Sequence, residues 1–186
     1  MLLFVGLGNP TPDSEHNRHN VGFKIIDSIN KKFSLSKQKP KFKGLLTTGN
    51  ISNKKIYAIK PLTFMNNSGI CIRELIEYFK INPEDVIVFH DDLDVEFGKI
   101  KAKFGGSSAG HNGIASIDKF IGKDYSRVRI GIGKPKTNLE IADFVLQNFD
   151  EEETVGIEKI SQNIIESISI LVEKKLDLFS STVNNK

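Results

Sequence analysis

The chain has 186 residues, of which 39% are hydrophobic and 26% charged, so it can bury a substantial core as one globular domain. No segment approaches the ~20 consecutive apolar residues that a membrane-spanning helix needs, and the first residues lack the charged start and apolar stretch of an export signal. The one cysteine, Cys71, cannot form an internal disulfide, which suits a reducing compartment. We therefore expect a single soluble domain over residues 1–186, located in the cytoplasm and with no membrane partner.

Charge is distributed unevenly along the chain, although the net charge of +3 is small. Residues 1–60 carry eleven Lys and Arg against three Asp and Glu, whereas residues 138–186 carry four against ten. Such segregation can create a positive face for a polyanion, but scattered lysines commonly do no more than solvate a surface. Charge alone therefore leaves a nucleic-acid partner open.

In the first half of the chain, short apolar runs alternate with stretches of helical spacing. The predicted elements are, in order, a buried strand at 2–5, a helix at 21–33, a lysine-rich loop at 37–43, strands at 45–48 and 55–60 around a turn at 49–53, a helix through 72–79, and a buried strand at 86–89. Ser68 can cap the second of these helices, and Asn82-Pro83 can end it.

In the second half, two strands combine a buried face with a basic face. Residues 99–104 alternate lysines with apolar residues, and residues 127–132 alternate arginines with apolar residues. A glycine-rich loop at 105–113 leads into a helix through 114–120, and apolar spacing from about 152 to 178 predicts one long amphipathic helix. Strands that alternate with helices predict an α/β fold, a three-layer sandwich in which a twisted mixed sheet carries helices on both faces.

The segment VGLGNP, residues 5–10, begins like a dinucleotide-binding loop but lacks the features that bind a pyrophosphate. Such a loop needs a third glycine and free backbone N–H groups. Here Thr11 takes the place of the third glycine, and Pro10 has no N–H to offer. What remains is a turn that presents the Asn9 amide at the edge of the sheet, or an asparagine that only forms the turn.

Histidine is the side chain whose ordinary pKa suits proton transfer near neutrality, and His19 comes just before a predicted helix. A lone histidine can equally be structural. The segment HDDLD, residues 90–94, could be a metal cluster, but consecutive strand residues point to opposite faces, so Asp91 and Asp92 cannot easily address one ion. We expect Asp91 instead to accept a hydrogen bond from the catalytic imidazole and to fix its tautomer.

Two further segments carry asparagines. The loop GGSSAGHNG, residues 105–113, lets backbone amides approach a phosphate or a peptide closely. Its Asn112 is either a site residue or the N-cap of the next helix. The segment KPLTFMNNSG, residues 60–69, places Asn66 beside Met65 and alone predicts little.

Taken together, these motifs resemble those of the bacterial peptidyl-tRNA hydrolase family. The matching segments, in order, are VGLGNP, RHNVG, KPLTFMNNSG, HDDLD, GGSSAGHNG, RIGIGKP and DFVLQNF, and they reach from Val5 to Phe149. The resemblance implies hydrolysis of the ester that joins a peptide or an N-blocked aminoacyl group to the 3′-terminal ribose of tRNA. It also implies a single α/β domain that needs no metal or organic cofactor, and we expect a monomer.

The resemblance further implies roles for individual residues. The expected catalytic residues are His19 as the base, Asp91 as its hydrogen-bonded partner, and Asn9. The residues expected to bind the acyl part of the substrate are Phe64, Met65, Asn66 and Asn112, and those expected to hold tRNA phosphates are Lys101, Lys103 and Arg129. Thr11 and Ser14 stand where the family usually carries glycine and tyrosine, so we expect substrate fit to differ on that side.

Overall fold

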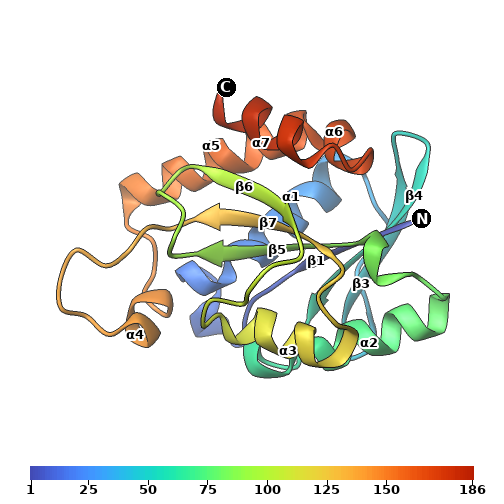
Figure 1. Cartoon of the computed structure of the whole chain (residues 1–186), viewed down its shortest axis with the longest axis horizontal. Coiled ribbons are helices and arrows are strands. Elements are labelled where there is room, and N and C mark those ends of the chain that lie inside the picture. The colour runs from blue at the N-terminus through green and yellow to red at the C-terminus, as the bar shows by residue number, and fades with distance from the viewer.

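The computed structural model describes all 186 residues and shows one seven-stranded sheet between two layers of helices (Figure 1). The strands are β1 (Leu2–Gly6), β2 (Lys39–Lys41), β3 (Gly44–Ile51), β4 (Lys54–Pro61), β5 (Val86–Asp92), β6 (Ile100–Phe104) and β7 (Ser126–Gly131). The helices are α1 (Val21–Lys32), α2 (Ser68–Phe79), α3 (Asn112–Ile121), α4 (Ile141–Val145), α5 (Glu151–Glu166), α6 (Ile168–Val172) and α7 (Leu176–Asn184). None of these helices has the length and apolar character that a bilayer crossing requires.

The sheet is mixed, with the strand order β2-β3-β4-β1-β5-β7-β6. The pairs of β1 with β4, β1 with β5, and β5 with β7 are parallel, whereas β2-β3, β3-β4 and β6-β7 are antiparallel. Helices α1 and α5 to α7 cover one face, and α2 and α3 cover the other (Figure 1). The predicted three-layer α/β sandwich with a mixed sheet is confirmed.

The alternation of side chains along β1 divides the interior into two apolar cores. Leu2 and Phe4 belong to the core beneath α1 and α5, whereas Leu3 and Val5 belong to the core above α2 and α3. All four side chains are buried, because a central strand of a sheet covered on both faces has no face toward water.

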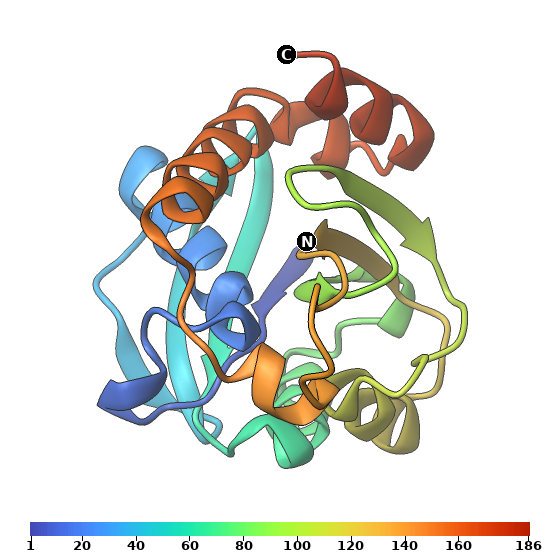
Figure 2. The same cartoon turned by 90° about the vertical axis from the view of Figure 1, so that its left-hand side faces the viewer.

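A close contact between glycines sets the position of α1. A Cβ atom on Gly6 would lie 2.3 Å from the carbonyl oxygen of Gly22, and one on Gly22 would lie 2.4 Å from that of Phe89. Only glycine therefore lets α1 lie this close to β1 and β5. The contact brings His19, just before α1, to the carboxyl ends of these strands, which face the viewer in Figure 2.

The sheet differs from prediction at one edge. The segment 37–43, expected as a loop, contains β2, and Lys39 pairs with Leu46 of β3. Its sequence KPK has no apolar alternation, and lysine and proline are residues that protect an exposed edge strand. The following turn is also shorter than expected: Ser52 and Asn53, with φ of 49° and 63°, form a tight two-residue connection.

The helix α2 begins and ends differently from prediction. Ser68 is not its N-cap, because its hydroxyl donates to the carbonyl of Met65 at 2.9 Å, inside the 3₁₀ turn Met65–Asn67 that precedes the helix. At the other end Lys80 adopts the left-handed conformation, with φ 54°, and ends the helix before Asn82-Pro83.

The single long helix predicted for 152–178 is wrong. The chain breaks at Ser167 and again at Lys174, where φ is 59°, so that α5, α6 and α7 form separate segments. The breaks let α7 run along the edge strand β6, where the backbone N–H groups of Ile100 and Ala102 donate to Asn184 Oδ1 and Ser180 Oγ at 2.9 and 2.8 Å. Apolar spacing continues through the breaks, so periodicity cannot detect them.

Candidate active site

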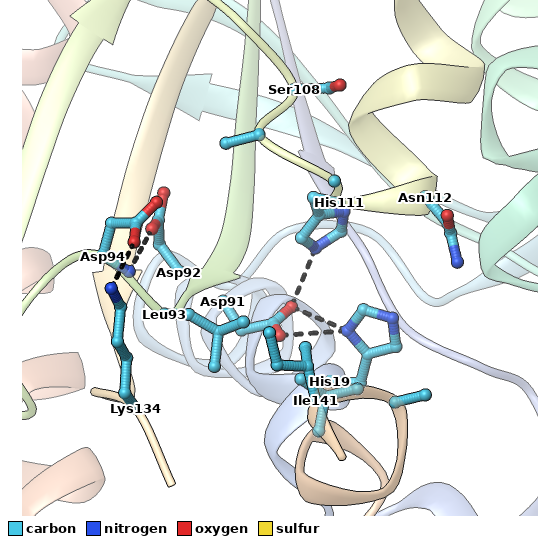
Figure 3. Close-up of a pocket in the computed structure, with 14 residues that line it drawn as sticks. His19, Asp91, Asp92, Leu93, Asp94, Ser108, His111, Asn112, Lys134 and Ile141 are labelled. Carbon is cyan, nitrogen blue, oxygen red and sulfur yellow. Dashed lines mark hydrogen bonds and ion pairs between the residues drawn. The ribbon is translucent and has the colours of Figure 1, made fainter.

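The predicted partners His19 and Asp91 meet at the carboxyl ends of β1 and β5 (Figure 3). Nδ1 of His19 lies 2.9 and 3.0 Å from the two carboxylate oxygens of Asp91, although the two residues are 72 positions apart in sequence. Both residues are buried, with exposed fractions of 8% and 2%. Because an ionised carboxylate only accepts hydrogen bonds, Nδ1 must carry the ring proton, which leaves Nε2 with a lone pair.

A second imidazole reaches the same carboxylate. Nε2 of His111 lies 2.9 Å from Oδ1 of Asp91, while its Nδ1 accepts hydrogen bonds from the backbone N–H groups of Gly113 and Ile114 at 3.1 and 3.3 Å. The sequence reasoning missed His111. A signal was available, since this histidine stands next to Asn112 in the same motif, shortly before a predicted helix.

The environment of Asp91 favours its ionised form. Burial alone would raise the pKa of this carboxyl, but the charges that His19 and His111 can carry and the N–H bonds they donate outweigh burial. The net effect holds the pKa of Asp91 well below its usual range. A permanent negative charge therefore stands beside both imidazoles.

The neighbouring Asp92 points away from this cluster, as strand alternation predicts. Its Oδ2 accepts a hydrogen bond from Nε of Arg129 at 2.8 Å, and its Oδ1 accepts one from the backbone N–H of Asp94 at 2.8 Å. Burial raises the pKa of Asp92, but the bond from Arg129 and the backbone bond from Asp94 lower it further than burial raises it. The carboxylates of HDDLD therefore do not converge on one point.

His19, Asp91 and His111 also offer ligand atoms that lie within 4.8 Å of one another, so a divalent cation is the alternative occupant of this cluster. A metal requires that the ligating ring nitrogens lose their protons. Here Nδ1 of His19 and Nε2 of His111 are both placed to donate to Asp91. The geometry favours a hydrogen-bonded triad over a metal centre.

His90, the residue before Asp91, is buried and has a strongly lowered pKa. Its Nδ1–H donates to the backbone carbonyl of Asp91 at 2.8 Å, and its Nε2 is buried without a partner. Burial, and then the charge of His111, lower the pKa of His90 to about 3. The folded protein therefore holds His90 neutral at pH values where the unfolded chain protonates it.

Acidification should accordingly destabilise the protein through His90. Because the unfolded state binds this proton below about pH 6.5 and the folded state does not, stability is retained above that pH and falls as the pH is lowered. Between pH 7 and pH 5 the loss attributable to His90 is about 2 kcal/mol. Urea unfolding at both pH values should show a smaller loss of unfolding free energy for His90→Asn. This variant keeps an N–H donor for the backbone carbonyl of Asp91. Equal losses in the two proteins would show that His90 does not titrate on unfolding.

Asn9 is held in one orientation by three hydrogen bonds. Its backbone N–H donates to Oδ1 of Asn20 at 2.8 Å, and Nδ2 of Asn20 donates to the Asn9 carbonyl at 2.9 Å. The backbone N–H of Met65 donates to Oδ1 of Asn9 at 2.9 Å. The side-chain oxygen of Asn9 is thereby engaged, and its NH₂ group remains as a donor. Asn20 is the positioning residue here.

The other predicted acyl-site residues differ in their placement. Asn112 lines the cavity beside His19, as the first residue of α3, and the helix is capped by His111 instead. Asn66 is exposed on the 3₁₀ turn before α2. Phe64, the residue directly before that turn, is also exposed and has a φ of 63°. Met65 is buried, with 4% of its surface exposed, so it packs beneath the site and does not line the cavity.

A cavity of about 330 Å³ opens beside His19. Its apolar lining consists of Leu93 and of Ile141, Ala142 and Val145 of α4. Ile141 lies beside His19 in Figure 3. The remaining lining residues are His19, Asp91, Asp92, Asp94, Ser108, Ala109, Gly110, His111, Asn112 and Lys134. The cavity is thus lined by both apolar and polar side chains.

Arg18 ties α4 to the segment that carries His19. Its Nη1 donates to the carbonyl of Phe144 at 3.2 Å, its Nη2 bonds to Glu153 at 2.9 Å, and its guanidinium stacks 4.2 Å from the centre of the Phe144 ring. The backbone N–H of Arg18 also donates to the carbonyl of Gln147 at 3.0 Å. The apolar wall of the cavity is therefore fixed to the residue adjacent to His19.

Comparison with known proteins identifies the family of the chain. The family model described as peptidyl-tRNA hydrolase matches residues 3–186. The chain belongs to the peptidyl-tRNA hydrolase family. A peptidyl-tRNA hydrolase of Pelagibacter ubique is 80% identical over 186 residues, which cover 100% of both chains. One of Bacillus subtilis is 42% identical over 175 residues, which cover 94% of this chain and 93% of the relative.

The fold of a solved member agrees as well. The crystal structure of peptidyl-tRNA hydrolase from Acinetobacter baumannii superimposes with a TM-score of 0.92 at 32% identity. The match covers 99% of this chain and 94% of the other. The similarity therefore extends over almost the whole of the chain.

The basic residues expected to hold tRNA in this peptidyl-tRNA hydrolase family member differ in exposure and in ion pairing. Lys101 and Lys103 are exposed on the edge strand β6. Arg129, which pairs with Lys101 in register, is mostly buried and bound to Asp92. Arg127, expected on the basic face of β7, is buried and donates to the carbonyls of the glycine-rich loop at Gly105 and Ser107. The free positive charge of this region is thus on β6.

The first loop departs from the usual peptidyl-tRNA hydrolase pattern in a defined way. The hydroxyls of Thr11 and Ser14 hydrogen-bond each other at 2.7 Å, and Ser14 is buried. Neither residue lines the cavity beside His19. The pair stabilises the loop itself and supplies no aromatic surface to the site.

Proposed function

We propose that this protein hydrolyses the ester between the peptide, or an N-blocked aminoacyl group, and the 3′-terminal ribose of tRNA. The products are a free peptide and a free tRNA. Membership of the peptidyl-tRNA hydrolase family supports the reaction class. The observation that carries the mechanism is the bond from Nδ1 of His19 to Asp91, which leaves Nε2 as an acceptor beside the cavity.

In the first step, Nε2 of His19 takes a proton from a water molecule as the water oxygen attacks the ester carbonyl carbon. The ring becomes an imidazolium, and the ionised Asp91 stabilises it without taking up the proton. In the second step, the bond from the carbonyl carbon to the ribose 3′ oxygen breaks, and the imidazolium returns its proton to that oxygen. General base catalysis of this kind contributes ~10²- to 10⁴-fold.

Neutral amides stabilise the charge that develops on the carbonyl oxygen. Because the side-chain oxygen of Asn9 accepts from Met65, its NH₂ group is the free donor. Asn112, which unlike Asn9 lines the cavity, supplies a second side-chain amide. One such donor is worth about 10²-fold or more. Asn66 bonds the peptide main chain, since an amide offers both a donor and an acceptor, and the exposed Phe64 covers the acyl group from outside.

The same amides select blocked substrates. A free aminoacyl group carries an ammonium. In the site this ammonium would lose its hydration and would find no free carboxylate with which to form an ion pair. The two further carboxylates at the cavity, Asp92 and Asp94, are each engaged with a cation, Arg129 and Lys134 respectively. We therefore expect unblocked aminoacyl-tRNA to be rejected.

Binding of tRNA is assigned to Lys101 and Lys103, with Arg129 as a weaker contributor because of its bond to Asp92. Lysine contacts to phosphate add affinity with little sequence reading. Lys103→Ala should raise KM, leave kcat within about twofold, and reduce the salt dependence of kcat/KM by about 0.7 to 0.9 in log–log slope. Lys159→Ala, an exposed lysine of α5, is the matched control. A collapse of kcat with unaltered KM would contradict a role in tRNA binding.

The complete set of catalytic and acyl-binding residues comes from one chain, so we propose that a single protomer is active as one domain over residues 1–186. The substrate arises during translation, which places the activity in the cytoplasm. No metal or organic cofactor takes part in the proposed steps. The partner is tRNA, and no membrane contact is invoked.

The deciding experiment is deacylation of N-acetyl-aminoacyl-tRNA by the purified protein, with and without EDTA. We expect release of tRNA that is indifferent to the chelator. Loss of activity with EDTA, restored by a divalent cation, would favour the metal reading of the His19, Asp91 and His111 cluster. Binding of tRNA without turnover would indicate an RNA-binding protein on the same scaffold.

A further inference from the structure

We propose that His111 is a positioning residue: its Nε2–H shares the Asp91 carboxylate with His19, and the first backbone N–H groups of α3 fix its tautomer. The inference deepens the proposed function and rests on it. His111 touches neither the attacking water nor the ester in this scheme. It acts through Asp91 on the proton affinity and orientation of His19.

The hydrogen bonds of His111 determine where its proton lies. The backbone N–H groups of Gly113 and Ile114 both point at Nδ1, at 3.1 and 3.3 Å. Two donors require a lone pair on that nitrogen, so the single ring proton must be on Nε2, 2.9 Å from Oδ1 of Asp91. Both ring nitrogens of His111 are therefore hydrogen-bonded in this tautomer, and they would not be in the other.

The same bonds prevent His111 from competing as a base. To accept a proton, Nδ1 would have to break both bonds at the start of α3, where backbone N–H groups have no partner within the helix. His19 has no such restraint, because its Nε2 makes no hydrogen bond to another protein group and its ring lines the cavity. Of the two imidazoles on Asp91, only His19 can take the proton of a water.

The shared carboxylate also moderates His19. Oδ1 of Asp91 lies 2.9 Å from Nδ1 of His19 and 2.9 Å from Nε2 of His111, so part of its charge is compensated by the second donor. The titratable and charged groups around this trio are His90, Asp92, Asp94, Arg129 and Lys134. The two aspartates among them are bound to the two cations. Because these neighbouring charges are paired, a substitution of His111 changes the electrostatics of His19 through Asp91.

Two variants separate the two bonds of His111. In His111→Gln the longer side chain places its amide where Nε2 was, so it can donate to Asp91 but gives no acceptor to the helix. In His111→Asn the shorter side chain can accept the N–H groups of α3, as a preferred N-cap residue does, but it cannot reach Asp91. Each variant thus keeps one function of the ring and loses the other.

For His111→Asn we expect the acidic limb of kcat/KM to move to higher pH by about half a unit to one unit. The reason is that a carboxylate with one donor fewer favours the protonated His19 more strongly. The midpoint of thermal unfolding should stay close to that of the unchanged protein. For His111→Gln the acidic limb should keep its position, while the lost cap lowers the unfolding midpoint by about 2–4 °C.

The pH profile of N-acetyl-aminoacyl-tRNA deacylation and the thermal unfolding of the three proteins test this separation. Equal shifts of the acidic limb in both variants, or a shift in neither, would overturn the proposal and leave His111 as a packing residue. The titration midpoint of the His19 ring, followed by NMR with ¹⁵N-labelled histidine, is read in parallel and should rise in His111→Asn only. If the protein does not deacylate the substrate at all, the proposed function fails, and the NMR titration still decides the role of His111.

Discussion

Replacement of His19 by alanine is expected to lower kcat for N-acetyl-aminoacyl-tRNA by about 10²- to 10⁴-fold, the range that general base catalysis supplies. The variant keeps the cavity, the asparagines and the basic strand β6, so KM should change little. Asp91 keeps its bond to His111 at 2.9 Å, so the buried carboxylate is not left without a donor. Single-turnover deacylation with substrate in deficit measures the chemical step directly.

The matched control for this variant is His16→Ala. His16 lies three positions earlier in the same loop, but its side chain is 66% exposed and it does not line the cavity. We expect its rate to equal that of the unchanged protein. If His19→Ala retained more than about a tenth of the original kcat, a general base at this position would be excluded.

The second large effect is expected from Asp91→Asn, which should lower kcat by about 10²- to 10⁴-fold, as the loss of the base itself does, while the fold persists. An asparagine places an NH₂ group where one carboxylate oxygen was. His19 can then accept that N–H at Nδ1 and carry its own proton on Nε2, the nitrogen that must be free to receive the proton of water. The loss follows from the wrong tautomer as well as from the missing negative charge.

Asp94→Asn is the corresponding control. Asp94 also lines the cavity and pairs with Lys134 at 3.6 Å, but both side chains are exposed. An exposed ion pair contributes little, so kcat should change by less than about threefold. An Asp91→Asn protein that is folded and nearly as active as the original would show that this carboxylate does not set the state of His19.

Arg18 connects α4, which lines part of the cavity, to the segment that carries His19. It precedes His19 in sequence, and its guanidinium holds the carbonyl of Phe144 and the carboxylate of Glu153. The partly buried bond to Glu153 joins the start of α5 to the turn that carries the base. The apolar wall on α4 is therefore connected to the catalytic side chain through one residue.

Local patterns in the sequence predicted most of the sheet, because alternation along β6 and β7 and the apolar runs of β1 and β5 reflect burial directly. They failed where tertiary contacts decide the structure. The edge strand β2 is formed from a lysine–proline–lysine sequence that pairs only because β3 lies beside it. The breaks between α5, α6 and α7 follow from the position of β6, which no periodicity records.

The candidate site shows the same division. Strand alternation correctly indicated that Asp91 and Asp92 would point apart, so that only one could serve a histidine. That this histidine is His19 came from the resemblance, since a separation of 72 positions in the sequence carries no geometric information. His111 was missed because its role depends on two backbone N–H groups and a carboxylate that converge only in the folded chain.

The central claim is that His19 presents an unprotonated Nε2 to the cavity while Nδ1–H bonds Asp91. Long-range ¹H–¹⁵N NMR spectra of ¹⁵N-histidine-labelled protein at neutral pH distinguish the two ring nitrogens directly, with His19→Ala for assignment. We predict one ring proton on Nδ1 and a nitrogen shift characteristic of a free lone pair on Nε2. A proton found on Nε2, with Nδ1 unprotonated, would contradict the account, because no acceptor would then face the attacking water.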